Sequence, residues 1–493
     1  MQGATKNEYK EETRLNSYRN IIKGTSFFGG VQIFNILITL IRGKFVAIIL
    51  GPEGMGISAL FNSAANTIQR FSSLGLNQSI IKDVAEENDP VKKEASIRTA
   101  LRLTNLTAIL GFVICGALCI PLSRLTFGDT YYWWQFLILG IGVALAIAGT
   151  GKLAILQGLH QVKRISRASL IGGLTGLCVG IPLYYIFGFK GIVPAIDAVF
   201  LALYIFYSVS LKRSYHFIYE SEKWKNYIPL AKNLLLLGIV LMSGEIIANM
   251  VTYLINLFVR ISGSVDDVGL YQAANSVTNQ FSGVIFSALA MDYFPRLSKI
   301  ASNNDKLRET VNKQSEIVSW LISPAMALLI LSTPLLIRVL LSESFQSVIP
   351  LMRWMGLGLL FRAFSFPMAY ITFAKGNKKV FFILEGLVAN TLTLVLSCGF
   401  FYFFGLIGLG YALVVDNALC MLLYYIVNRK LYGYNFSQSS SINFILGFIF
   451  VGGCFIFSFF SSEALSYSLM GVITAVTIVW SLMALKSHYK TAE

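Results

Sequence analysis

Charged residues are scarce in this chain, and the motifs of nucleotide and metal chemistry are missing. Only 13% of the 493 residues are charged, about half the share in an ordinary soluble domain. The sequence has no GxxxxGK run followed by Ser or Thr, and no polar insertion able to house a nucleotide-binding domain, so we do not expect direct ATP hydrolysis. The six cysteines lack metal-site spacing, and we expect neither disulfides nor a metal centre.

Apolar residues take the place of the missing charge. Hydrophobic residues make up 55% of the chain and occur in runs long enough to cross a bilayer, which takes about 20 mainly apolar residues. The net charge of +15 comes from cations in short loops between these runs rather than from one soluble face, which argues against nucleic-acid binding. The chain is therefore predicted to be an all-α integral membrane protein in a lipid bilayer.

These runs predict fourteen transmembrane helices. The first six are Thr25–Ile49, Gly56–Ile80, Leu101–Leu122, Trp134–Leu156, Leu170–Phe187 and Gly191–Val209. The next six are Leu234–Leu257, Leu270–Phe294, Ile317–Leu336, Val348–Phe373, Val380–Phe404 and Ile407–Val427. The last two are Ile442–Phe460 and Leu465–Leu485.

Lys and Arg are distributed unevenly between alternate loops, which sets the predicted orientation. Most of the 40 Lys and Arg residues lie in the two tails and in the loops after even-numbered helices. The opposite loops hold only Arg124, Lys190, Arg260 and Arg338. Because positively charged loops stay in the cytoplasm, both termini are expected to be cytosolic. Lys152 and Arg353 lie near span ends, where we expect them to anchor at the interface.

An internal repeat relates two parts of the chain. When residues 45–66 are aligned with residues 258–279, Gly56 falls on Gly269 and Asn62 on Asn275. Six helices separate the copies, so they enter the membrane with the same polarity. We therefore predict two six-helix lobes that face each other across a central cavity. The expected segments are a cytosolic tail at 1–23, a first lobe at 24–209, a cytosolic linker at 210–232, a second lobe at 233–430, and two extra helices with a cytosolic tail at 431–493.

Basic residues inside predicted spans are candidates for an anion site. Arg42, Lys44 and Arg70 lie in apolar surroundings in the first two helices, and Arg362 is equally deep in helix 10. A cation at bilayer depth costs roughly 2.5–3.5 kcal/mol, so we expect these residues to face a wet cavity, where Arg suits phosphate oxygens. The alternatives are that Arg42 and Lys44 reach out to the interface, and that Arg70 pairs with a carboxylate. For Arg362 the alternative is a salt bridge to Glu245.

Four carboxylates lie at depth within predicted spans: Asp197, Glu245, Glu385 and Asp416. A carboxylate in a low-dielectric site can carry a proton through a transport cycle or bind Na⁺ when ionised. We expect Glu245 and Asp416, nearest to mid-membrane, to be the first candidates for ion coupling. The alternative is that the carboxylates neutralise the embedded arginines.

Amide and hydroxyl side chains recur at helical spacing in the two copies of the repeat. Such groups hydrogen-bond the hydroxyls of a sugar, although they also join helices to each other. The predicted polar lining of the cavity consists of Asn62, Asn66, Asn275, Ser276 and Asn279.

Three runs of sequence resemble a known family of transporters. They are IRGKFVAIILGPEGMGISALFNS, RFSSLGLNQSIIKDVAE and GLYQAANSVTNQFSGVIFSALAMDYFPRLSKI. They are similar to the Wzx-type flippases of the polysaccharide-exporter branch of the MOP superfamily, which also contains the MATE transporters. The resemblance implies flipping of an oligosaccharide carried on undecaprenyl pyrophosphate, such as an O-antigen unit of lipopolysaccharide, across the bacterial inner membrane by alternating access. It also implies a monomer that works beside the polysaccharide polymerase and chain-length machinery.

The resemblance extends to individual arginines. In the related lipid II flippases an arginine nine residues before the first turn's Gly lines the cavity, and Arg42 stands at that spacing before Gly51. An arginine in the second helix of those proteins matches Arg70. This chain has Ser276 where those relatives carry a further cavity arginine, which disfavours lipid II itself as the substrate.

Two other classes of membrane protein remain as alternatives. A MATE-type multidrug exporter coupled to a cation would have a cavity dominated by carboxylates and aromatics, whereas the embedded charges of the first lobe are mainly basic. A membrane-bound glycosyltransferase or polymerase would need a sizeable outer loop with catalytic residues, and the outer loops here are short. Charge and loop length therefore favour a flippase, which is a transporter and not an enzyme, with no cofactor besides H⁺ or Na⁺.

Overall fold

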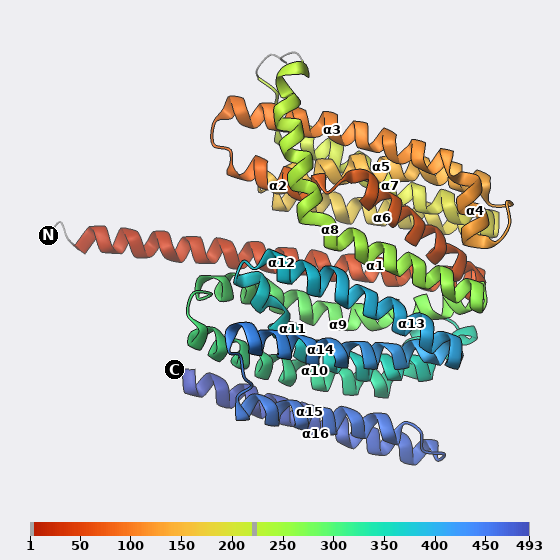
Figure 1. Cartoon of the computed structure of the whole chain (residues 1–493), viewed down its shortest axis with the longest axis vertical. Coiled ribbons are helices and arrows are strands. Elements are labelled where there is room, and N and C mark those ends of the chain that lie inside the picture. The colour runs from red at the N-terminus through yellow and green to blue at the C-terminus, as the bar shows by residue number, and fades with distance from the viewer. Residues whose placement is uncertain (1–3, 219–223, 493) are drawn as a thin grey trace.

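The computed structural model describes residues 4–218 and 224–492, and its described residues form helices without strands (Figure 1). The first half contains α1 (Ala4–Ser73), α2 (Leu76–Glu86), α3 (Pro90–Ala117), α4 (Cys119–Phe127), α5 (Trp133–Gly158), α6 (Val162–Phe187), η1 (Gly188–Gly191) and α7 (Ile192–Ser214). The second half contains α8 (Trp224–Ser262), α9 (Val265–Lys299), α10 (Asn304–Leu340), η2 (Glu343–Val348), α11 (Ile349–Ala374), α12 (Lys378–Phe381), the π-helix η3 (Phe382–Ala389), α13 (Asn390–Phe404), η4 (Gly405–Ile407) and α14 (Gly408–Tyr432). The hairpin of α15 (Gln438–Phe457) and α16 (Glu463–Ala492) follows.

Helical segments cover each of the fourteen predicted ranges. Ten stretches of the described chain are long and apolar enough to cross a membrane, and the longest of them run through more than one predicted helix, as 162–214 and 378–432 do. The fold is therefore the predicted all-helical integral membrane type. The number of fourteen crossings and the lobe boundaries stay predictions. Part of the expected linker, 219–223, lies outside the described residues, and α8 begins at Trp224, inside the range expected to be linker.

A glycine divides α1 into two helical parts. Gly51 has φ +66° and ψ −165°, a conformation that only glycine adopts without strain, and Pro52 follows it. The missing N–H of Pro52 is tolerated because the proline opens the second helical part. This break falls between the first two predicted helices, Thr25–Ile49 and Gly56–Ile80.

The helices form two groups with the hairpin at one side (Figure 1). One group contains α2–α7 and the other α9–α14, while α15 and α16 lie against the outside of the second group. The start of α1 and the end of α16 lie at the same end of the bundle, called here the terminal end. The opposite end is called the far end.

The halves of the repeat contact each other through two equivalent glycines. A methyl group on Gly56 of α1 would overlap the carbonyl oxygen of Val265, and one on Gly269 of α9 would overlap the carbonyl oxygen of Pro52. Gly269 and Val265 are the repeat equivalents of Gly56 and Pro52, so the contact is reciprocal. Backbones can approach this closely because glycine has no side chain.

The buried core is shared at one end of the bundle and divided at the other. One cluster combines first-half residues such as Leu60 with second-half residues such as Ile330. At the terminal end there are two separate clusters. One surrounds Leu76 and Ile97 of the first half, with the start of α8, and the other surrounds Tyr293 of the second half. The two halves therefore pack together toward the far end and keep separate cores at the terminal end.

Candidate functional site

An ion pair between α1 and α8 joins two of the predicted charged residues, one from each half of the chain. Arg70 of α1 lies 3.0 Å from Glu245 of α8, and the two side chains are 38% and 50% exposed. These fractions place the pair beside open space rather than inside a packed core. The same turn of α8 carries Asn249, whose backbone carbonyl accepts a hydrogen bond of 3.4 Å from Thr67 of α1.

This pair corrects one prediction. Glu245 was expected to pair with Arg362 if Arg362 had a structural role, but the structure places Glu245 against Arg70 instead. The reason is geometric, because hydropathy gives the depth of a residue in the membrane and not the direction in which its helix faces. The alternative for Arg70, a pair with a nearby carboxylate, is the one the structure contains.

Arg362 belongs to a second polar cluster within the second half. The exposed side chain of Arg362 on α11 has its guanidinium 5.7 Å from the centre of the Phe286 ring, within the range of a cation–π contact. It also lies close enough to Glu385 and Asp416 to interact electrostatically with both. Three predicted site residues from separate segments therefore come together here.

The two carboxylates of this cluster have neutral polar neighbours. The Thr393 hydroxyl of α13 donates to Asp416 of α14 at 2.8 Å, and Tyr424 of α14 interacts with Glu385. Glu385 lies in the π-helix η3, an element found frequently at functional sites. The sequence did not identify Thr393 or Tyr424, because a hydroxyl on a neighbouring helix carries no signal of its own.

Arg42 and Lys44 are half-buried in α1 before the glycine break. Arg42 interacts electrostatically with the buried Tyr184 of α6. The adjacent turns hold α1 on α6 as well, since Asn35 donates to Ser169 at 3.2 Å. Arg42 is thus oriented toward the first helix group, separate from the Arg362 cluster.

Asp197 stands apart from the other carboxylates. It lies on α7 against Gly142 of α5, where a methyl group on the glycine would overlap its carboxylate. One carboxylate oxygen is buried and has no hydrogen-bond partner in the described structure. The four predicted coupling residues therefore occupy three places: Asp197 within the first half, Glu245 on Arg70, and Glu385 with Asp416 in the second half.

The predicted polar lining bonds within its own helices. Asn62 donates to the Ser58 carbonyl at 2.8 Å, and Asn279 donates to the Asn275 side chain at 2.6 Å. Asn66 is exposed and Ser276 half-buried. In the described parts of the chain the amides of Asn62 and Asn279 therefore bond along α1 and α9 rather than across a helix contact.

Comparison with known proteins identifies a family and several relatives of this chain. Residues 45–350 match the family described as "Polysaccharide biosynthesis protein". The Lipid III flippases of Escherichia coli (strain K12) and Shigella flexneri are 24% identical over 370 residues, which cover 73% of this chain and 86% of each relative.

Two solved structures share the fold over most of their length. One is Lipid II flippase MurJ in an inward closed conformation, with a TM-score of 0.71 at 14% identity over 96% of this chain and 99% of that chain. The other is an inward-facing multidrug resistance MATE family transporter of the MOP superfamily, with a TM-score of 0.62 at 18% identity over 81% and 94%. With the family match covering more than half of its length, the chain belongs to the polysaccharide biosynthesis protein family and has the fold of the MOP-superfamily transporters.

Proposed function

We propose that this protein flips an undecaprenyl-pyrophosphate-linked oligosaccharide, such as an O-antigen unit, from the cytoplasmic to the outer leaflet of a bacterial inner membrane. The observation that carries the proposal is the arrangement of the core, which is shared toward the far end and divided at the terminal end. A transporter that alternates access needs two halves that separate at one end while they meet at the other. The named activity of the Lipid III flippase relatives supports the choice of cargo class.

The transport cycle then consists of a rocking motion of the two helix groups. The lobes proposed here are residues 24–209 and 233–430, with both termini in the cytoplasm. In the described conformation the terminal end admits the cargo, and the reciprocal contact of Gly56 and Gly269 closes the far end. Release to the outer leaflet requires that this glycine contact separates while the terminal end closes.

The proposed recognition of the head group is electrostatic. Arg42, Lys44, Arg70 and Arg362 supply positive charge to the pyrophosphate, because a guanidinium presents a planar set of donors to phosphate oxygens. Arg70 exchanges its contact with Glu245 for the cargo during the cycle. The sugar is held by hydrogen bonds to a separate polar lining. That lining consists of Asn62, Asn66, Asn275, Ser276 and Asn279.

Ion coupling is proposed for the carboxylates, with H⁺ or Na⁺ as the driving ion. Asp416 and Glu385 have the strongest support, since both interact with Arg362, and Asp416 also accepts a hydrogen bond from Thr393. Binding of a cation between them changes the local charge that Arg362 meets, which links ion binding to the affinity for an anionic head group. Glu245 and Asp197 are the remaining candidates.

A MATE-type multidrug exporter is the second candidate, and the likeness to an inward-facing MATE transporter supports it. Deletion of the gene separates the two. The flippase predicts loss of surface polysaccharide and accumulation of lipid-linked units on the cytoplasmic leaflet. Unchanged polysaccharide combined with increased sensitivity to cationic dyes would favour the exporter.

Complementation of that deletion tests the cationic site. Arg42→Ala and Arg362→Ala are expected to abolish surface polysaccharide at normal membrane expression, and the Lys replacements are expected to restore part of it. Arg124→Ala, which removes an exposed cation outside the predicted site, is the matched control. Normal export by both Ala variants would contradict a cationic cavity.

A further inference from the structure

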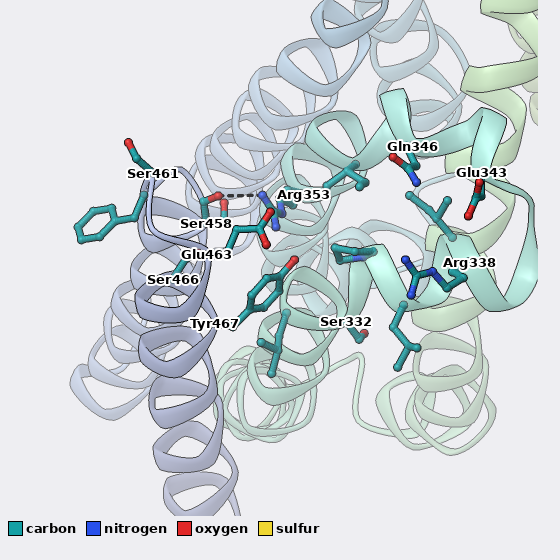
Figure 2. Close-up of a pocket in the computed structure, with 16 residues that line it drawn as sticks. Ser332, Arg338, Glu343, Gln346, Arg353, Ser458, Ser461, Glu463, Ser466 and Tyr467 are labelled. Carbon is teal, nitrogen blue, oxygen red and sulfur yellow. Dashed lines mark hydrogen bonds between the residues drawn. The ribbon is translucent and has the colours of Figure 1, made fainter.

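A pocket at the far end of the bundle contains none of the residues assigned to transport. It has a volume of about 920 Å³ and lies between α10, η2 and α11 on one side and the α15–α16 hairpin on the other (Figure 2). Its walls are formed where α10 and α15 end and where α11 and α16 begin. Because helix ends lie at the membrane–water boundary, the pocket is placed at an interface.

Two cations and two carboxylates line this pocket. They are Arg338 of α10, Glu343 of η2, Arg353 of α11 and Glu463 of α16. Within the described chain Arg338, Glu343 and Glu463 form no ion pair. Figure 2 shows the Arg338 guanidinium directed toward the middle of the pocket. The lining therefore presents both signs of charge without net excess of either.

Arg353 keeps one donor unused. Its guanidinium donates to the carbonyl of Ser458 at 2.8 Å and interacts with the Tyr467 hydroxyl. Its Nε is buried and has no acceptor in the described structure. Because this Nε is buried, Arg353 offers a ligand in the pocket its positive charge rather than this donor.

Apolar side chains complete the walls. Leu335 and Phe460 are 63% and 43% exposed, and both line the pocket beside Leu331 and Ile349. A ligand here meets charged groups and hydrocarbon at once. That combination matches a lipid with a small charged head group better than it matches a soluble ion.

We propose that this pocket binds the head group of a zwitterionic phospholipid that carries a primary ammonium, of the phosphatidylethanolamine type. The phosphate accepts hydrogen bonds from Arg338, and the positive charge of Arg353 adds to its attraction. The ammonium donates to Glu463 across the pocket from Arg338, and the acyl chains lie along Leu335 and Phe460. An anionic head group would leave Glu463 unpaired, and a choline head group has no N–H to donate to it.

The bound lipid joins two parts of the protein. Arg338 and Glu343 belong to the second helix group, whereas Glu463 belongs to the hairpin. A head group between them stabilises the docking of the hairpin on α10 and α11. This role is separate from the transport of cargo, so it holds whichever substrate the protein carries.

Native mass spectrometry of the purified full-length chain tests the proposal. Delipidated protein in detergent is titrated with phosphatidylethanolamine, phosphatidylcholine and phosphatidylglycerol that have the same acyl chains. We expect the first lipid to bind about tenfold more tightly than the others, since a hydrogen bond to a charged group contributes about a factor of ten or more. Arg338→Ala is expected to lower that affinity about tenfold, and Glu463→Gln to remove the preference over phosphatidylcholine.

Two further arms make the result decisive. Arg124→Ala, the control from an exposed position outside the pocket, should bind the three lipids like the unmodified protein. Added phosphatidylethanolamine should raise the melting temperature of the unmodified protein but not that of Arg338→Ala. Equal binding of all three lipids, or stronger binding of phosphatidylglycerol with no effect of Glu463→Gln, would overturn the proposal in favour of a general anion pocket. Competition by soluble glycerophosphoethanolamine at the same concentration as the lipid would overturn it in favour of a soluble ligand.

Discussion

Arg70 of α1 and Glu245 of α8 form an ion pair of 3.0 Å with both side chains partly exposed. α8 packs at its start with the core of the first half and carries this contact further along its length. Because exposed pairs contribute about 0–1 kcal/mol, the pair can open without a large loss of stability. That property suits a cation that must exchange one anionic partner for another.

Substitution of each partner separates pairing from cargo binding. Arg70→Ala is expected to abolish export, and Glu245→Gln to retain a substantial part of it, because in the proposed cycle the arginine and not the carboxylate contacts the head group. Either change should lower stability by no more than about 1 kcal/mol. The measurement is the amount of lipid-linked oligosaccharide on the cytoplasmic leaflet, with Arg70→Lys as a partial rescue. Equal loss of export in both variants would indicate that the pair is purely structural.

A methyl group at the reciprocal glycine contact should shift the conformational equilibrium. Gly56→Ala forces α1 away from the Val265 carbonyl, so we expect the far end to open. Spin labels at the exposed positions Asp129 and Ser344, one in each half, would then report a longer distance in pulsed electron resonance. Gly471→Ala, whose added methyl meets nothing within 4 Å, is the control. An unchanged distance distribution in Gly56→Ala would show that the contact does not hold the two halves together.

The break in α1 should be sensitive to its backbone conformation alone. Gly51→Ala is expected to destabilise the protein by about 1–3 kcal/mol, the cost of a non-glycine residue at its φ and ψ. No atom lies within 4 Å of the added methyl group, so crowding does not contribute. Thermal unfolding in detergent measures the effect, and Gly399→Ala, which lies in α13 with open space around it, should not be destabilised. A melting temperature for Gly51→Ala equal to that of the control would contradict the strain argument.

The Asp416 cluster should control any dependence of transport on an ion. Thr393→Val removes the hydroxyl that donates to Asp416 at 2.8 Å and is expected to change the apparent ion affinity about tenfold. Asp416→Asn should remove the ion dependence. Reconstituted vesicles with imposed Na⁺ or pH gradients provide the measurement, with Asp197→Asn compared in parallel. If Asp197→Asn alone removes the dependence, the coupling site lies in the first half instead.

Much of the fold follows from the sequence because hydropathy and loop charge report length and depth. Helical segments account for most of every predicted range, and the break at Gly51 and Pro52 lies between the first two predicted helices. The alignment of Gly56 with Gly269 has a physical basis, since both glycines let α1 and α9 approach each other. These features can be predicted from a single sequence because helices must bury apolar surface and satisfy their own backbone hydrogen bonds in the membrane.

The partners of the charged residues were harder to predict. Depth along a helix does not give rotation about its axis, which is why Glu245 was named as the alternative partner of Arg362 although it contacts Arg70. Thr393 was missed because its hydrogen bond to Asp416 depends on how the two helices pack and is not visible in the sequence around it. Arg353 was interpreted as an interface anchor, and its contact with Ser458 across the hairpin depends on how α15 docks on α11.

The glycine contact between α1 and α9 has the form of an interface between two identical subunits, in which each partner offers the same patch to the other. Each half contributes one glycine and one carbonyl, so the seal at the far end consists of two equal parts. The two parts adjoin each other, since a methyl group on Gly269 would also approach the backbone of Gly56. A side chain added to either glycine therefore separates α1 from α9 and disturbs both parts of the seal.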